Sequence, residues 1–205
     1  MKLLSHRGYW KQSKEKNTAV SFERSFSMGL GTETDIRDYN GEVVISHDIP
    51  TGGELKFIDM LEIYNKYDNN LPLALNIKSD GLQGKIKTQL QEQNIKNYFL
   101  FDMSVPDHIV SLKQGLKCYT RHSEYDNCPL YEKSAGIWID CFDSDWINES
   151  VINKHLQNNK TVCIVSPELH GREYISAWGK YKNIKNDDVM LCTDFPEKAV
   201  EFFNG

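Results

Sequence analysis

Residues 2–48 read KLLSHRGYWKQSKEKNTAVSFERSFSMGLGTETDIRDYNGEVVISHD. The apolar runs at 2–5 and 31–35, the latter continuing into 43–46, have the composition of strands, and 18–28 has the spacing of an amphipathic helix. A strand, a helix and another strand in this order predict parallel strands with the helix packed outside them. This stretch therefore indicates an α/β fold.

The same alternation continues through the rest of the chain. Further strands are predicted at 73–78, 98–102, 116–120, 136–141, 161–166 and 188–193. Further helices are predicted at 56–66, 82–93, 107–114, 149–157, 174–182 and 197–203, with a doubtful one near 128–133. When 31–46 is counted as one bent unit, eight strand–helix repeats result, which predicts a compact single-domain TIM (β/α)8 barrel over residues 1–205. An open doubly wound sheet is the alternative, although no Gly-x-Gly-x-x-Gly sequence follows an early strand.

The composition narrows the classes of partner. A net charge of −5 and the lack of a basic run interleaved with aromatic residues argue against a nucleic-acid surface. No apolar stretch is long enough to span a bilayer, so no stable membrane anchor is expected. The first residues lead directly into a polar motif without a signal peptide, so we expect a cytoplasmic protein. The five cysteines lie far apart, which favours reduced thiols over disulfides or a zinc site, and the oligomeric state is left open.

Two histidines and two acidic residues lie at or near the ends of the apolar runs. They are His6, Glu33, Asp35 and His47. Histidine gives and takes protons near neutral pH, and two acidic residues two positions apart on a strand point to the same face, where their oxygens can converge on one cation. A single histidine of this kind is more often structural, but four such residues together predict acid–base chemistry at a bound metal ion.

These residues belong to a set of short motifs. The set comprises His6-Arg7-Gly8, Asn17-Thr18 followed by Phe22, Glu33-x-Asp35 and His47-Asp48, with Thr193-Asp194-Phe195-Pro196 near the end of the chain. As a set, the motifs resemble the signature of the glycerophosphodiester phosphodiesterase family, which is related to the phosphatidylinositol-specific phospholipase C barrels. Any one motif is weak evidence, and between residue 50 and the last motif the resemblance is mostly one of element order.

The resemblance implies a role for each matching residue. His6 and His47 would form the general acid–base pair, in an order that the motifs leave open, and Arg7 would contact the phosphate. Glu33 and Asp35 would hold a divalent metal ion, Mg²⁺ or Ca²⁺. The implied activity is metal-dependent hydrolysis of a glycerophosphodiester-like small molecule, which gives an alcohol and sn-glycerol 3-phosphate in lipid metabolism.

The sequence departs from the family at the third metal ligand. The family usually carries Glu-x-Lys at the end of the third strand, whereas this chain has Asn76-Ile77-Lys78. An amide oxygen can ligate Ca²⁺ or Mg²⁺ but supplies no charge, so we expect weaker metal binding or a substitute carboxylate. Glu168 is the preferred substitute, and Asp102 and Asp140 are rivals. Lys78 is a candidate phosphate contact, with a salt-bridge role as the alternative.

Two alternative functions remain open from the sequence. The first keeps the barrel but makes it a phospholipase C-like lyase, in which a neighbouring hydroxyl attacks the phosphorus and a cyclic phosphate forms. The second is a catalytically silent barrel that binds a phosphorylated ligand, which Asn76 makes plausible. The presence of both His6 and His47 argues against the silent barrel, because a binding protein needs no proton transfer.

Overall fold

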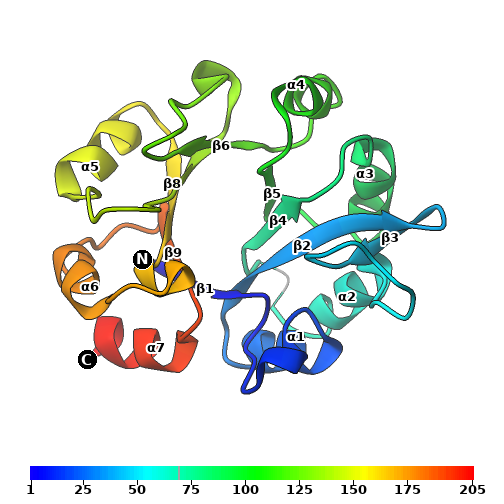
Figure 1. Ribbon diagram of the computed structural model, residues 1–205, viewed down its shortest axis with the longest axis horizontal. Coiled ribbons are helices and arrows are strands. Elements are labelled where there is room, and N and C mark those ends of the chain that lie inside the picture. Colours follow the sequence, from blue (N-terminus) through cyan, green and yellow to red (C-terminus); the bar gives the residue numbers. More distant parts are fainter. Residues whose placement is uncertain (69) are drawn as a thin grey trace. The chain divides into compact units, whose positions relative to one another are not determined.

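The structure is a computed structural model that describes residues 1–68 and 70–205. It contains two compact units, one formed by Ser5–Cys118 and the other by Met1–Leu4 with Tyr119–Gly205. In each unit, strands alternate with helices along the chain (Figure 1). The expectation that residues 1–205 form one domain stays a prediction.

The unit Ser5–Cys118 carries the motif-rich part of the sequence. Its elements, with β1 shared between the units, are β1 (Lys2–His6), the 3₁₀ helix η1 (Ser13–Glu15), α1 (Ala19–Ser27), β2 (Gly31–Tyr39), β3 (Glu42–Ile45), α2 (Phe57–Tyr64), β4 (Leu73–Ile77), α3 (Gln83–Glu92), β5 (Tyr98–Phe101) and α4 (Val105–Lys113). Parallel pairing joins β2 to β4 and β4 to β5, with Asp35 opposite Asn76 and Asn76 opposite Phe101. Because the strands are parallel, residues at their carboxyl ends meet at one edge of the sheet.

The expectation of one bent strand at 31–46 was wrong. β2 continues to Tyr39, and β3 returns antiparallel to it, with Tyr39 opposite Glu42. The two turn residues, Asn40 and Gly41, have left-handed φ angles of 48° and 84°. An Asn-Gly pair favours this two-residue hairpin turn because both positions need φ above zero. The physical reason for the difference is therefore local turn chemistry, which the Asn-Gly pair already encodes.

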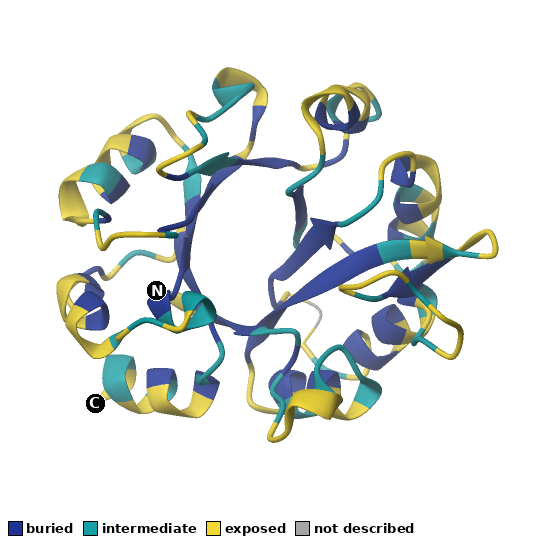
Figure 2. Ribbon diagram, in the orientation of Figure 1, coloured by how far each residue is buried: buried dark blue, intermediate teal, exposed yellow. Residues whose placement is uncertain are grey.

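The core of this unit lies between its strands and helices. Figure 2 shows the strands as buried and the outer faces of the helices as exposed. The fully buried Phe26 of α1 and Tyr64 of α2 meet edge to face, with ring centroids 5.3 Å apart. The Tyr64 hydroxyl donates to the Leu71 carbonyl at 2.8 Å, so the one polar atom of this ring is satisfied. Burying each such aromatic contributes roughly 2–3 kcal/mol, which fixes α1 and α2 against the strands.

The second unit repeats the alternation. Its elements are β6 (Tyr119–His122), the 3₁₀ helix η2 (Tyr131–Lys133), β7 (Gly136–Ile139), α5 (Glu149–Gln157), β8 (Thr161–Val165), the 3₁₀ helix η3 (Pro167–His170), α6 (Ile175–Tyr181), β9 (Val189–Thr193) and α7 (Pro196–Asn204). The strands β6 to β9 are parallel neighbours in chain order. Trp178 of α6 is fully buried against Phe202 and Phe203 of α7, and its indole N–H donates to the Ser166 hydroxyl at 2.7 Å. The doubtful helix near 128–133 is the short η2.

Two further predictions concern membrane-spanning helices and the state of the cysteines. No helix among the described residues combines the length and the apolarity needed to cross a bilayer. All five cysteines are free thiols, as the sequence predicts. Four of them are buried, and Cys128 is partly buried.

Candidate active site

A tight turn at the end of β1 positions the first motif. Arg7 and Gly8 both have left-handed backbones, with φ angles of 59° and 78°. The Gly8 N–H donates to the Thr32 hydroxyl at 3.0 Å. A Cβ atom on Gly8 would lie 2.4 Å from Oγ of Ser21 in α1, so glycine serves both the left-handed backbone and the close approach of the helix. The turn lets the side chains of His6 and Arg7 reach the acidic residues of β2.

Asp35 is fully buried and is contacted by two cations. Its Oδ2 lies 2.9 Å from Arg7 Nε, and its Oδ1 lies 3.4 Å from Lys78 Nζ. The Asn17 amide donates a further hydrogen bond to Oδ2 at 2.9 Å. A buried carboxylate is tolerated only with such partners, because its desolvation costs several kcal/mol. Lys78 therefore lies beside Asp35, where it forms a salt bridge and could also contact a phosphate.

Glu33 is the second buried carboxylate. Its Oε2 lies 3.8 Å from His6 Nε2 and accepts from the Arg7 backbone N–H at 3.3 Å, and the Asn76 amide hydrogen-bonds the same carboxylate. Burial, and then the charge of Asp35, raise the pKa of Glu33 well above its usual range. The two-residue spacing thus brings two acidic groups into one buried space, as the strand alternation predicts.

Asn76 supplies an oxygen beside these carboxylates. Among the described residues, its buried Oδ1 has no hydrogen-bond donor, and Asp35 Oδ1 likewise has none, with the ion pair to Lys78 beside it. A buried acceptor without a donor costs about 1–3 kcal/mol, which a cation at this point would relieve. Two carboxylates and an amide oxygen are hard oxygen ligands of the kind that Mg²⁺ and Ca²⁺ prefer. The residues present therefore fit a divalent cation.

The donor set is nevertheless smaller than that of a tight metal site. Among residues 1–68 and 70–205, no group of three or more His, Cys, Asp or Glu side chains is arranged to hold a metal ion. Arg7 and Lys78 both already pair with Asp35. A cation at Glu33, Asp35 and Asn76 would compete with these two side chains, so weak binding is expected here.

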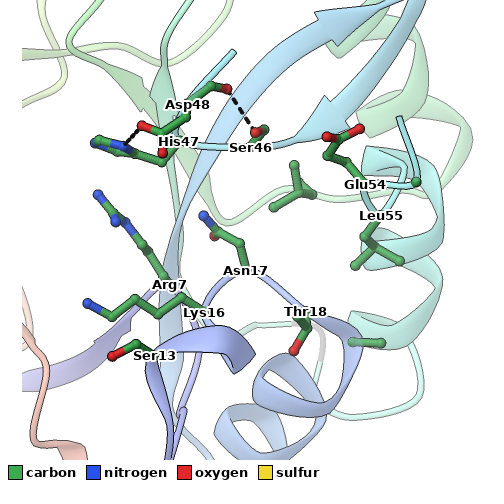
Figure 3. A pocket seen from close by; sticks show the side chains of 13 residues that line it. Arg7, Ser13, Lys16, Asn17, Thr18, Ser46, His47, Asp48, Glu54 and Leu55 are labelled. Carbon is green, nitrogen blue, oxygen red and sulfur yellow. Dashed lines mark hydrogen bonds and ion pairs between the residues drawn. The ribbon is translucent and has the colours of Figure 1, made fainter. Parts of the chain in front are cut away.

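His47 follows β3 and is more open to solvent than the other expected residues of this unit. Its side chain is 44% exposed, and its Nδ1 lies 2.8 Å from Asp48 Oδ1. Together with Arg7, it lines a cavity of about 550 Å³. In Figure 3 the Arg7 guanidinium points toward the His47 imidazole. His47 thus faces the same space as the arginine that contacts Asp35.

Glu168, the preferred substitute ligand, belongs to the other unit. Its carboxylate accepts hydrogen bonds from the hydroxyls of Ser166 and Thr193 and from the Asp194 backbone N–H at 3.1 Å. Burial raises the pKa of Glu168, and these donors oppose the rise. Its oxygens therefore already have donors within its own unit, and its role as a metal ligand stays a prediction.

The two rival carboxylates also lie at strand ends. Asp140 follows β7, and its Oδ1 lies 2.6 Å from His170 Nε2. Asp102 follows β5, which is the neighbour of β4, and has a left-handed φ of 65°. Neither observation makes one of them a ligand, so the choice among the three stays open.

Asn17 is a site residue to which the motif alone assigns no role. Its amide donates to Asp35, its Oδ1 accepts from the Thr34 hydroxyl at 2.9 Å, and its N–H donates to the Arg7 carbonyl at 2.9 Å. Asn17 has a left-handed φ of 60°, a backbone conformation that asparagine tolerates better than most residues. Asn17 therefore fixes Arg7 and Asp35 relative to each other. In the sequence, the Asn17-Thr18 motif is the feature that points to this residue.

Comparisons with known proteins add to this geometry. No protein-family model matches the sequence, and no curated protein matches it. Among solved structures, the chain is similar to a glycerophosphodiester phosphodiesterase from Agrobacterium tumefaciens, with a TM-score of 0.76, 13% identity and 100% of both chains covered. A glycerophosphodiester phosphodiesterase from Thermotoga maritima gives a TM-score of 0.67 at 16% identity, over 97% of this chain and 96% of that one.

A third similar structure is a Ca²⁺-dependent phosphatidylinositol-specific phospholipase C from Streptomyces antibioticus. Its TM-score is 0.60 at 9% identity, over 98% of this chain and 96% of that one. At such low identities the likeness shows the fold, and it confirms the predicted α/β fold of the TIM (β/α)8-barrel class. The chain thus has the fold of solved glycerophosphodiester phosphodiesterases, the family that its motifs resemble, and of a phosphatidylinositol-specific phospholipase C.

Proposed function

We propose that this protein hydrolyses a small-molecule phosphodiester of the glycerophosphodiester type, with a divalent metal ion, to an alcohol and sn-glycerol 3-phosphate. The observation that carries the proposal is the position of Arg7. Its guanidinium pairs with Asp35, its backbone N–H binds Glu33, and its side chain lines the cavity that His47 also lines. One residue thus connects the acidic pair with a cavity that holds an acid–base group. The resemblance in motifs and the likeness in fold support the same activity.

Arg7 and Lys78 would bind the phosphate. Both are partly exposed cations at a buried carboxylate, and a guanidinium suits two phosphoryl oxygens at once. Charge that develops on the phosphoryl oxygens in the transition state would be stabilised by groups already held in place. Asn17 and Asp35 would keep the Arg7 side chain oriented for this contact.

His6 and His47 would carry the two proton transfers. One accepts a proton from the attacking hydroxyl or water, and the other donates a proton to the leaving alcohol oxygen. Glu33, whose Oε2 lies 3.8 Å from His6 Nε2, would keep that imidazole in place for the transfer. Asp48 would hold Nδ1 of His47, which leaves Nε2 for the proton transfer. The geometry assigns neither histidine to the acid or the base.

Glu33, Asp35 and Asn76 would hold the divalent cation. When bound, the cation would neutralise charge on the phosphoryl oxygens and polarise the reacting phosphate. Glu168 would be a fourth ligand only if it exchanged its present donors for the cation. We also propose that the protein is cytoplasmic and takes part in lipid metabolism.

The silent barrel is a second candidate that one observation favours. Arg7 and Lys78 both lie beside Asp35 and are partly exposed, so a phosphorylated ligand could bind at these cations without a metal. The hydrolase turns over its substrate and needs a metal, whereas the silent barrel does neither, so an activity assay with and without metal distinguishes them.

Hydrolysis of a chromogenic phosphodiester, with and without a chelator, tests the proposal. Hydrolysis that stops with the chelator and returns with Mg²⁺ or Ca²⁺ supports it, and activity that survives complete metal removal contradicts the Glu33 and Asp35 assignment. A glycerophosphodiester in ¹⁸O-labelled water then separates the hydrolase, which places the label directly in glycerol 3-phosphate, from a lyase, which releases a cyclic phosphate. A lack of turnover with every divalent ion, together with binding of glycerol 3-phosphate, would favour the silent barrel.

A further inference from the structure

We propose that Arg37 is a positioning residue, which holds the backbone of His47 so that the imidazole stays at the Arg7 end of the cavity. It acts through His47 and not by contact with the substrate. The inference rests on the proposed function, in which His47 carries one of the two proton transfers. It adds a residue that belongs to none of the sequence motifs.

The segment that carries His47 gains little from burial. β3 ends at Ile45, and the next helix, α2, begins at Phe57. Between these elements, the side chains of Asp48 and Ile49 are 94% and 80% exposed, and that of His47 is 44% exposed. Because apolar burial contributes in proportion to the area removed from water, it restrains these residues only weakly. Hydrogen bonds must therefore fix the position of His47.

Two hydrogen bonds tie this segment to β2. The Ser46 N–H donates to the Asp35 carbonyl at 3.0 Å, which continues the pairing of β3 with β2 by one residue. Nε of Arg37 donates to the His47 carbonyl at 3.0 Å. The first bond joins two backbone groups, whereas the second depends on a side chain. The sequence therefore determines the second bond through the choice of residue 37.

Strand geometry explains how Arg37 reaches His47. Glu33, Asp35 and Arg37 are two positions apart on β2, so their side chains lie on the same face of the strand. Tyr39 is the next residue on this face, and its hydroxyl donates to the Thr51 carbonyl at 3.3 Å. One row of side chains thus carries the acidic pair and then two donors to the segment that follows β3.

The Arg37 guanidinium has no carboxylate within ion-pair distance among the described residues. His47, and more weakly the charges of Arg7 and Arg37, lower the pKa of Asp48. Asp48 is therefore within electrostatic reach of both arginines, although it pairs with His47. A hydrogen bond from a charged donor is roughly twice as strong as one between neutral groups, which suits Arg37 to hold an exposed carbonyl.

The two restraints on His47 act on different parts of the residue. Asp48 holds Nδ1 of the ring at 2.8 Å, and Arg37 holds the backbone carbonyl. Asp48 belongs to the same exposed segment, so without Arg37 the ring and its carboxylate partner would move together. Proton transfer requires the acid or base within about 2.6–3.2 Å of the reacting oxygen. Arg37 therefore determines how often the imidazole occupies a productive position.

Steady-state hydrolysis of glycerophosphoglycerol, with Mg²⁺ or Ca²⁺ in excess, tests this inference. Arg37→Met removes the donor and keeps an unbranched side chain, and Arg37→Lys keeps a cationic donor. The matched control is Lys85→Met, because the exposed Lys85 of α3 also donates to a backbone carbonyl of the β2–β3 hairpin, that of Gly41 in the turn. Thermal unfolding of each variant checks that the fold is unchanged.

We expect Arg37→Met to lower kcat by about tenfold to a hundredfold and to leave KM within about twofold, because the bound substrate keeps its contacts. Arg37→Lys should recover part of the loss, and Lys85→Met should change neither constant. A raised KM with an unchanged kcat in Arg37→Met would show that Arg37 contacts the substrate and would overturn the positioning role. An unchanged kcat and KM would overturn it as well.

A double variant tests whether Arg37 acts through His47. In a protein that already carries His47→Gln, the position of residue 47 no longer matters for proton transfer. Adding Arg37→Met should therefore leave kcat within about twofold of that of His47→Gln alone. A further loss as large as the one in the unmodified protein would mean that the two residues act independently, which would contradict the inference.

A measurement without substrate separates this inference from the proposed function. We expect the backbone ¹⁵N order parameter of His47 to fall from about 0.85 to below about 0.6 in Arg37→Met and to stay unchanged in Lys85→Met. If no diester is turned over, the proposed function fails, but this loss of order would still establish that Arg37 holds His47. An unchanged order parameter in Arg37→Met would refute the inference, whatever the activity.

Discussion

Asp35 and Asn76 are neighbours in register on the parallel strands β2 and β4, and the buried amide oxygen of Asn76 has no hydrogen-bond donor among residues 1–68 and 70–205. In the family that the motifs resemble, a carboxylate usually takes the Asn76 position. The substitution removes one negative charge from a group in which Arg7 and Lys78 both pair with Asp35. We therefore expect a cation to bind weakly at this position.

Replacing Asn76 by Asp should strengthen metal binding and weaken the metal-free protein. A third acidic group beside Glu33 and Asp35 adds repulsion in a buried space, so we expect a loss of about 2 kcal/mol or more in the free energy of unfolding without metal. With Ca²⁺ or Mg²⁺ the loss should be recovered, because a ligand that binds only the folded state stabilises it. Thermal unfolding with and without metal measures both effects. Asn94→Asp adds the same charge at an exposed asparagine, and an equal metal response in the two variants would refute the ligand role of Asn76.

His6→Gln and His47→Gln should each lower kcat by about 10²–10⁴, because a positioned acid or base contributes a factor of this size. Both variants should retain the fold, since His47 is largely exposed and His6 is partly exposed. Initial rates on a chromogenic diester provide the measurement. Ile49→Ala is the control, because Ile49 is an 80% exposed neighbour of the second motif. A rate within about threefold of the unmodified protein in either histidine variant would disprove its assigned role.

Gly8→Ala should destabilise the protein far more than Gly29→Ala. Both glycines have left-handed φ angles, 78° and 70°, so each substitution costs about 1 kcal/mol for the backbone alone. At Gly8 the new Cβ atom would also meet the Ser21 side chain and backbone within 2.8 Å, whereas nothing lies within 4 Å at Gly29. Urea unfolding should show an additional loss of about 1–3 kcal/mol for Gly8→Ala. Equal losses would mean that the turn at the first motif is not packed against α1 as described.

The stability of the protein should fall in weak acid because of His155. This residue is buried, with Nδ1 3.0 Å from the Tyr131 hydroxyl and Nε2 3.0 Å from His122 Nδ1. Burial, and then the charge of His122, lower the pKa of His155 to about 4 from an ordinary 6.5. The unfolded chain therefore binds a proton more readily than the folded one between these values. We expect no effect above pH 6.5, and a loss of up to about 3 kcal/mol as the pH falls to 4.

Urea unfolding at a series of pH values between 4 and 7 measures this dependence. His155→Gln removes the titrating group, and its stability should vary less over the same range. Gln157→Ala is the matched control, because Gln157 is an exposed, non-titrating residue of the same helix and its replacement should leave the slope unchanged. A slope as steep in His155→Gln as in the unmodified protein would show that another group is responsible.

Much of the fold can be predicted from the sequence because the spacing of apolar residues indicates which face of each helix or strand is buried. The helix at 149–157 is observed with the same bounds, and most of the other elements differ by one or two residues at their ends. Two differences are larger. The Asn40–Gly41 turn makes residues 31–46 a hairpin, which the Asn-Gly pair encodes locally. β6 begins three residues later than expected, at Tyr119, because its start depends on pairing with β7, which periodicity does not describe.

The site is less completely predictable. The spacing of Glu33 and Asp35 predicts that they share a face, since strand geometry fixes it. The ion pairs that Arg7 and Lys78 make with Asp35 depend on three strand ends meeting, and the donors around Glu168 depend on packing within its own unit.

A crystal of the protein soaked with Mn²⁺ or Ca²⁺, with anomalous scattering recorded, shows directly whether Glu33, Asp35 and Asn76 bind a cation. We predict one anomalous peak within about 2.0–2.6 Å of oxygens from these three side chains. We also predict that the Asp35 carboxylate exchanges part of its pairing with Arg7 and Lys78 for the cation. A well-ordered cation elsewhere in the molecule, with these three side chains unchanged and unliganded, would contradict the account.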